Sequence, residues 1–277
     1  MEIFPSEYQS IELSRYEKMF VRHAISADGY GFLLLKVNPA MMDKESMNVV
    51  ITSGGVIFCK FFEDFTDASL FGGFIQTYVP LIYPTTKNII TDKLLGNKSI
   101  SENGTHLKFP INIVYVFPNL KRADIAKLDM ASFADFVANQ CLFSEDFSEL
   151  RQGFSVVMER YLSSPVVPLA KDRLTISDLN VNSILQRIAP EYVTVRVACI
   201  AEDETTPGVD SELLGVDEKD VVVKAFRLDK EQINIVNRIS KDDPNQLILA
   251  CAGSGKSVLL ISKCFKAAQM NPTKKFL

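Results

Sequence analysis

The sequence contains few of the residues from which metal sites and catalytic triads are built. Of its 277 residues, two are histidines and five are cysteines. The cysteines show no CxxC spacing, and both histidines, His23 and His106, lie far from any of them and lack a recognisable nucleophile partner. This scarcity argues against a zinc site and against a nucleophile–histidine triad. We interpret the cysteines as buried, reduced thiols of a cytoplasmic protein.

Long apolar runs and an excess of positive charge are also missing. No stretch approaches the roughly 20 apolar residues of a membrane-spanning helix, and the N-terminus has no basic region of the kind that begins a signal peptide. The net charge is −4 and the isoelectric point is near 5.4, whereas binding to nucleic-acid phosphates favours basic proteins. We expect a globular cytoplasmic protein with no membrane partner. Overall charge does not support nucleic-acid binding, although a local basic patch is compatible with it.

The most explicit chemical motif lies at residues 250–257, which read Ala-Cys-Ala-Gly-Ser-Gly-Lys-Ser. The apolar run 246–250 predicts a buried parallel strand, and apolar residues at helical spacing over 257–269 predict a helix. Between such a strand and helix, backbone N–H groups of a glycine-rich loop bind phosphate oxygens. The sequence therefore predicts a site for a nucleoside triphosphate, and the residues assigned to it are Ala252, Gly253, Ser254, Gly255, Lys256 and Ser257.

Two of these residues have defined chemical roles in a phosphate-binding loop. We expect the Lys256 ammonium to contact the β- and γ-phosphates and the Ser257 hydroxyl to ligate Mg²⁺. The general motif begins with glycine, where this chain has Ala250. The alternative is a glycine-rich turn that is followed by Lys-Ser by chance.

With its alanine at position 250, the loop resembles motif I of superfamily 1 helicases of the UvrD/Rep type. A second match lies upstream, at Phe226-Arg-Leu-Asp-Lys-Glu-Gln232, which precedes an amphipathic helical pattern. In that family a Leu-(Asn/Asp)-x-x-Gln element opens the motor domain, and its glutamine recognises adenine. The resemblance implies that Gln232 reads the adenine of ATP. It covers residues from about 226 to 277.

The resemblance implies that the chain is the N-terminal part of an ATP-dependent helicase or translocase, with ATP and Mg²⁺ as cofactors and nucleic acid, DNA being favoured, as partner. The acidic Walker B strand, the arginine finger and the strand-binding motifs of the family would follow Leu277. We therefore assign no catalytic residue to this chain and expect it to be inactive alone. The alternative is a non-catalytic α/β binding or regulatory module that carries an inert phosphate loop.

Residues 201–225 are acidic and rich in turn formers, which predicts a linker between an accessory domain, 1–200, and the truncated start of a P-loop motor domain, 226–277. The accessory domain alternates helical and strand patterns, so its predicted fold class is α/β with a mixed sheet. Expected strands are 31–37, 47–52, 55–61, 110–117 and 192–200. Expected helices cover 11–24 and most of 122–188, and the turn Ser53-Gly54-Gly55 predicts a hairpin.

The hairpin resembles part of the nuclease-related domain, a restriction-endonuclease-like fold often fused to UvrD-type helicases. In that family one strand opens with Asp and the next ends in Glu-x-Lys, and these residues hold Mg²⁺ and activate water. Aligned on the glycine turn, this chain has Met47, Lys60 and Phe62 at the three positions. Glu63 and Asp64 follow at shifted positions. The resemblance implies a degenerate, inactive nuclease-like domain, and the alternative is an unrelated α/β accessory domain.

Overall fold

The computed structural model describes residues 1–5, 8–39, 46–128, 130–190, 192–198, 221–227, 232, 235–236 and 256–270. It divides the chain into two compact units, Met1–Ala189 and Pro190–Leu277. The described helices include none that is long and apolar enough to cross a membrane.

The first unit is built on a six-stranded mixed sheet with the strand order β1-β2-β3-β4-β7-β8. The strands are β1 (Glu2–Phe4), β2 (Gly31–Val37), β3 (Met47–Thr52), β4 (Gly55–Phe61), β7 (Ile111–Phe117) and β8 (Cys141–Phe143). β2, β3 and β4 are antiparallel neighbours, β1 runs parallel to β2, and β7 and β8 continue in parallel from β4. The predicted α/β fold class with a mixed sheet is confirmed for this unit.

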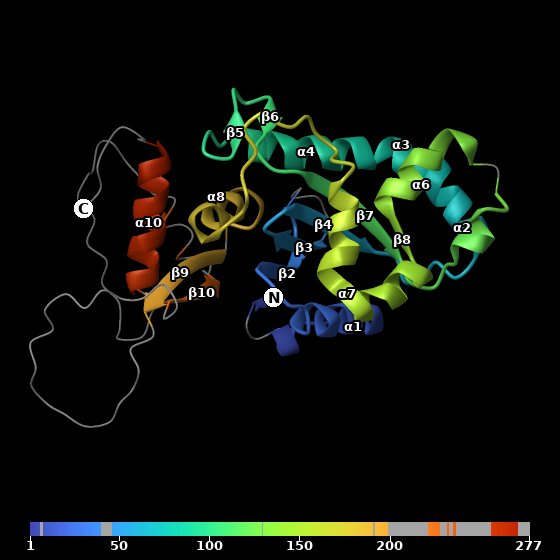
Figure 1. The fold of residues 1–277 in the computed structure, drawn as a ribbon, viewed down its shortest axis with the longest axis horizontal. Helices are drawn as coiled ribbons and strands as arrows, with labels where there is room; N and C mark the ends of the chain where they lie inside the picture. The colour runs from blue at the N-terminus through green and yellow to red at the C-terminus, as the bar shows by residue number, and fades with distance from the viewer. Residues whose placement is uncertain are drawn as a thin grey trace, which may run out of the picture. The chain divides into compact units, whose positions relative to one another are not determined.

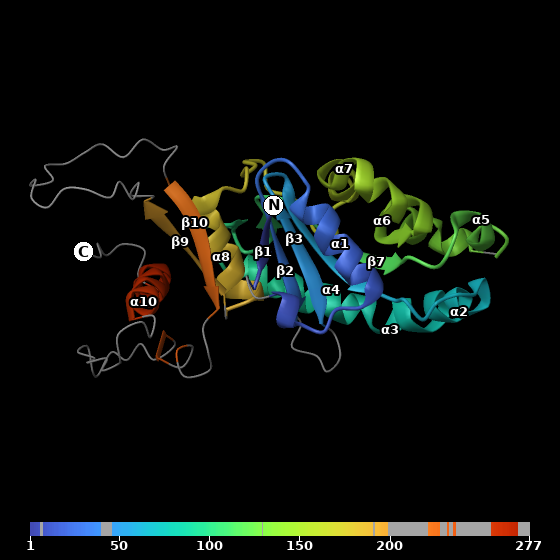
Figure 2. The same ribbon diagram turned by 90° about the horizontal axis from the view of Figure 1, so that it is seen from below.

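Helices cover both faces of this sheet, as Figures 1 and 2 show. Helix α1 (Arg15–Ile25) precedes β2, and the segment between β4 and β7 forms α2 (Ala68–Gly73), the π-helical turn η2 (Phe74–Tyr78), α3 (Val79–Leu81) and α4 (Tyr83–Leu95). After β7 follow α5 (Arg122–Ile125), α6 (Ala134–Gln140), α7 (Ser144–Leu162) and α8 (Asp178–Ile188). Short pieces complete the unit: the 3₁₀ turns η1 (Tyr8–Ser10) and η3 (Ala131–Phe133), and the small strands β5 (Ser101–Glu102) and β6 (His106–Leu107).

One face of the sheet packs against α1 and α7. Phe20, Val21 and Ala24 of α1 and Phe154 of α7 belong to one buried cluster with side chains of β2, β3, β4 and β7. Phe20 is fully buried and its ring meets that of Phe154 edge-on, 4.9 Å between centroids. The apolar stripe of α1 therefore faces the core, and its opposite side faces solvent.

The other face of the sheet carries an aromatic cluster. Tyr115 and Phe117 of β7 are fully buried. They contact Phe62, which follows β4, and Phe74 of η2, with ring centroids 5.1–6.0 Å apart. Aromatic side chains bury a large apolar area, so this cluster fixes the η2 region on the sheet.

The tight joint between β4 and β7 requires a glycine at position 55. The carbonyl oxygen of Pro110 accepts a hydrogen bond from the backbone N–H of Val56 at 3.0 Å. A Cβ atom at Gly55 would lie 2.4 Å from the same oxygen, which is closer than any side chain allows. The glycine turn therefore serves two purposes, since it closes the β3–β4 hairpin and admits the approach of the β7 strand.

The second unit contains an antiparallel strand pair and a helix. Strand β9 (Tyr192–Ala198) pairs with β10 (Val221–Arg227), so that Tyr192 lies opposite Arg227 and Ala198 opposite Val221. Helix α10 (Lys256–Met270) contacts β9. The unit begins at Pro190, before β9, whereas the sequence places this strand in the accessory domain. The reason is the pairing with β10, which the pattern of a single strand does not reveal.

Several predicted elements are confirmed. The strands 31–37, 47–52 and 55–61 have the expected bounds, and β7 begins one residue after the expected Pro110. Helix α1 begins at Arg15 rather than at Ile11, because Ser14 caps it. Strand β8 was not predicted, since it lies in the stretch expected to be helical. The predicted strand 246–250 lies outside the described residues, as does most of the predicted linker.

Burial predicts the reactivity of the described cysteines. Cys59 and Cys141 are buried as expected, and this desolvation raises the pKa of both thiols far above the usual range. Cys264 is exposed, so the expectation of a buried thiol is wrong at this position. Because the thiolate is the reactive form, we expect iodoacetamide at pH 8 to modify Cys264 in the folded protein. Cys59 and Cys141 should react only after denaturation. Mass spectrometry of peptides from native and denatured samples measures this, and rapid native labelling of Cys59 would contradict the packing.

Candidate functional site

The structure places three of the predicted nucleotide-binding residues. Lys256 is the first residue of α10, and Ser257, the second, is exposed. Gln232 is helical and half-buried. The loop residues Ala252, Gly253, Ser254 and Gly255 lie outside the described residues. The predicted helix 257–269 is confirmed, and the Lys-Ser pair falls in its first turn.

The segment that carries Gln232 contacts helix α10. Ile235, three residues after Gln232, is helical, and its carbonyl oxygen accepts a hydrogen bond from Nζ of Lys263 at 3.1 Å. Val236 and Leu259 are both buried. Ile235 and helix α10 are therefore in contact in the second unit.

The three positions aligned with the nuclease motif do not form a catalytic site. Met47 is only 1% exposed. Phe62 belongs to the aromatic cluster and stacks on Phe117, with 5.4 Å between ring centroids. Lys60 is half-buried. Two of the three side chains are thus apolar and packed, so that the described residues offer no Asp, Glu and Lys set at these positions.

A polar cavity of about 330 Å³ nevertheless lies at this edge of the sheet, where β2 and β4 end and β3 begins. Ligand sites of open α/β sheets commonly lie outside the carboxyl ends of parallel strands, and β4 is one of these here. Charged and hydroxyl side chains dominate the lining, which includes Ser14, Glu17, Lys36, Lys60, Glu63 and Asp64.

The carboxylate of Glu17 is the centre of this cavity's polar network. The side chain is 5% exposed, and both of its oxygens accept hydrogen bonds from Nζ of Lys36 at 2.7 Å. Nδ2 of Asn48 donates to one oxygen at 3.1 Å, and the backbone N–H of Ser14 donates to the other at 3.0 Å. A buried carboxylate is costly unless it is paired and hydrogen-bonded, and here four bonds meet that requirement.

The backbone of Lys36 is adapted to this pairing. Its φ of 53° lies in the left-handed region, which residues other than glycine rarely adopt, at a cost on the order of 1 kcal/mol. The register between β2 and β3 shifts at this point, between Leu34 and Val37. The N–H of Lys36 donates to Oδ1 of Asn48 at 3.0 Å. Asn48 therefore fixes both the bulge and the carboxylate that the lysine meets.

The same network caps α1. Ser14 is the N-cap residue. Its hydroxyl accepts a hydrogen bond from the backbone N–H of Glu17 at 3.2 Å, and the Glu17 carboxylate accepts one from the backbone N–H of Ser14. The Ser14 hydroxyl also donates to Glu63. Sequence reasoning did not select Glu17, Lys36 or Asn48. The Ser-x-x-Glu pattern was the available signal, since it is typical of a capping box.

The charges of the cavity largely cancel. Glu17 is neutralised by Lys36, and in the part of the chain that the structure describes no group of three His, Cys, Asp or Glu side chains converges as a metal site requires. The arrangement therefore suits a structural ion pair at the cavity floor better than water activation by a metal ion.

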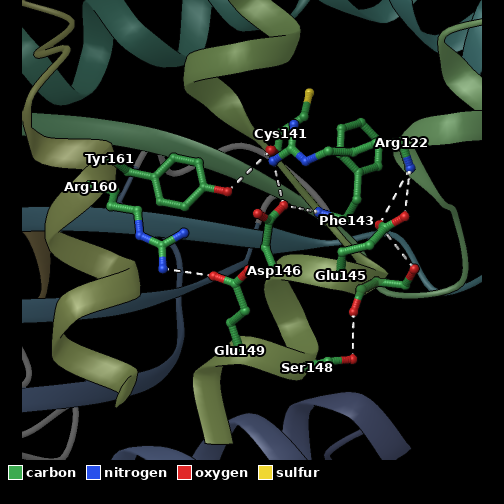
Figure 3. Close-up of polar contacts among 10 residues, drawn as sticks. Arg122, Cys141, Phe143, Glu145, Asp146, Ser148, Glu149, Arg160 and Tyr161 are labelled. Atoms are coloured by element: carbon green, nitrogen blue, oxygen red, sulfur yellow. Dashed lines mark hydrogen bonds and ion pairs between the residues drawn. The ribbon is translucent and has the colours of Figure 1, made fainter. Parts of the chain in front are cut away.

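A second polar network joins α5 to α7 (Figure 3). Asp146 accepts from the guanidinium of Arg122 and from the backbone N–H of Phe143, the latter at 3.0 Å, and so caps its own helix. Glu145 accepts from the backbone N–H of Arg122 at 3.1 Å and so caps α5. The Arg122 guanidinium lies over the ring of Phe143 at 5.0 Å. Each helix start is thus stabilised by an acidic residue of α7.

Beside this junction lies an apolar cavity of about 340 Å³. It is bounded by α5, η3, α6 and β8, and its lining includes Ile125, Leu128, Met130, Val137, Ala138 and Phe143. Helix α6 contains no buried residue. Nothing in the described residues marks this cavity for a particular ligand.

Comparison of the chain with models of known protein families, with curated proteins and with solved structures finds no match. The assignment of a function therefore depends on the residues and geometry above.

The buried pair predicts an energetic coupling between Glu17 and Lys36. We expect Lys36→Met to lower the free energy of unfolding by about 2 kcal/mol, because it removes a bidentate charged partner from a buried carboxylate. Adding Glu17→Gln should recover part of this loss, since a neutral amide no longer needs the ammonium. Urea denaturation of the two single variants and the double variant measures the coupling.

The matched control for this comparison of single and double variants is Lys18→Met. Lys18 lies on the exposed side of α1, the helix that carries Glu17, so this substitution should change the free energy of unfolding by less than about 0.5 kcal/mol. Strict additivity of the Glu17 and Lys36 substitutions would show that the two charges do not interact.

Proposed function

We propose that residues 226–277 form the opening segment of an ATP-dependent DNA helicase or translocase motor of the UvrD/Rep type. In this proposal Ala252–Ser257 bind the phosphates of ATP, Ser257 ligates Mg²⁺ and Gln232 reads adenine. Lys256 supplies the cation for the β- and γ-phosphates.

The observation that carries this proposal is that Lys256 and Ser257 lie in the first described turn of helix α10. A phosphate-binding loop needs its Lys-Ser pair at the start of a helix, because the helix N-terminus offers N–H groups and a partial positive charge. The contact between Lys263 and Ile235 adds support, since it holds the Gln232 segment beside that helix.

For the first unit we propose a non-catalytic binding role, within either a degenerate nuclease-like fold or an unrelated α/β fold. The antiparallel β3–β4 pair followed by β7 beside β4 agrees with the strand order that the nuclease resemblance implies. The buried Met47, the packed Phe62 and the neutralised Glu17 favour a binding module over an active nuclease.

The phosphate-binding role of Lys256 has a direct test. We expect Lys256→Ala to weaken binding of a fluorescent ATP analogue with Mg²⁺ at least tenfold, because the variant lacks a charge-assisted bond to the phosphates worth about 1.5–3 kcal/mol. Fluorescence titration of the full chain measures the affinity, and Lys98→Ala, an exposed lysine of the first unit, is the charge-matched control. Equal affinity of the wild type and Lys256→Ala would overturn the role.

The role of Gln232 predicts a change in base preference. A glutamine amide offers one donor and one acceptor to the edge of adenine. We therefore expect Gln232→Ala to reduce the ratio of ATP to GTP affinity while GTP affinity stays the same, as competition titrations would measure. Parallel loss of both affinities would instead indicate that Gln232 supports the fold of the segment.

A further inference from the structure

The solvent-facing side of α1 is cationic along its length. Arg15, Lys18 and Arg22 are exposed and recur at i, i+3 and i+7, which places them on one stripe of the helix about 10 Å long. The acidic residue of the helix, Glu17, is buried on the opposite side. The stripe therefore presents positive charge with no carboxylate from its own helix.

Helix α7 extends this charge with Arg151, which is exposed. Burial and the positive charge of Arg151, in that order, lower the pKa of His23 on α1. Helices α1 and α7 pack against each other, and the His23 ring contacts Phe147 of α7, one turn before Arg151. We call Arg15, Lys18, Arg22 and Arg151 the α1 basic face.

Some cations of the first unit are paired with carboxylates and others are not. Lys36, Arg122, Lys127 and Arg160 each form an ion pair with a carboxylate. Among the residues that the structure describes, no ion pair involves a member of the α1 basic face, and Arg15 lies over the ring of Tyr16 at 5.8 Å. Four cations without a carboxylate partner create a local positive potential on a chain of net charge −4.

The chemistry of the face favours nucleic acid over a membrane surface. A helix that lies on a membrane must present its apolar side to the lipid. The apolar side of α1, with Phe20, Val21 and Ala24, is instead buried on the sheet, so the helix offers charge to a partner. Three of the four members of the α1 basic face are arginines, whose planar guanidinium matches phosphate oxygens in a bidentate geometry.

We propose that the α1 basic face binds the phosphate backbone of nucleic acid, without reading its sequence. The choice of DNA as the polyanion rests on the proposed motor function, while the surface itself belongs to the first unit. The net charge of −4 does not reveal such a local basic face.

The test compares two triple variants of the full chain in binding to a fluorescein-labelled single-stranded DNA oligonucleotide. In the first, Arg15→Gln, Lys18→Gln and Arg22→Gln remove the stripe on α1. We expect the affinity at about 100 mM salt to fall about tenfold and the slope of log K against log salt to decrease in magnitude by about 2, since each lost phosphate contact removes about 0.7.

The second variant is the matched control, with Lys98→Gln, Lys171→Gln and Arg173→Gln at exposed positions elsewhere on the same unit. The change in net charge is the same, and we expect wild-type affinity and slope. Thermal denaturation of both variants confirms that they fold. Equal losses in the two variants would overturn the proposal, because they would show an effect of net charge alone.

Other partners give distinct outcomes. Wild-type binding to phosphatidylserine-containing vesicles or to polyglutamate, with no binding to the oligonucleotide, would overturn the proposal in favour of a membrane or an acidic protein. ATP-analogue binding is measured on the same samples. If the variant with three substitutions on α1 binds the ATP analogue normally but no longer binds DNA, the result supports DNA binding by the α1 basic face. If Lys256→Ala loses ATP binding while its DNA affinity is unchanged, the result tests the proposed ATP site and not the α1 basic face.

Discussion

The ion pair and hydrogen bonds of the buried Glu17 carboxylate organise one end of the first unit's sheet, where β2 and β4 end and β3 begins. The carboxylate joins the start of α1 to the bulge of β2 and the first residues of β3 through four hydrogen bonds. A helix that is fixed at its first turn and packed along its apolar stripe cannot rotate about its axis. The direction in which α1 presents Arg15, Lys18 and Arg22 therefore follows from a buried acid on its opposite side.

This arrangement separates two kinds of positive charge. Lys36 is paired within the cavity and stabilises the fold, whereas the cations of the α1 basic face have no carboxylate partner among the described residues. The attraction between a lysine and its carboxylate is stronger in a partly buried site than in water. Exposed arginines instead keep most of their hydration and can bind a polyanion from solution. The unit thus uses cations both for internal cohesion and for its surface potential.

Much of the sheet could be predicted from the sequence, because β2, β3 and β4 are apolar runs bounded by turn residues. Strand β8 could not, since three residues, Cys141–Phe143, become a strand by pairing with Tyr115–Phe117 of a distant segment. The start of α10 at Lys256 agrees with the helix expected after the phosphate loop. The Glu17–Lys36 pair and the α1 basic face depend on tertiary proximity and on which side of a helix is covered, which composition and net charge do not contain.

The pairing of β9 with β10 also has a consequence for how this chain can change. Ala198 and Val221 are opposite each other in the ladder, so the pairing holds together the two residues that flank positions 199–220. The entropic cost of joining two paired strands rises only slowly with the number of residues between them. Insertions or deletions between residues 199 and 220 would leave the ladder register intact, which makes this position the natural place for the gene to gain or lose sequence during evolution.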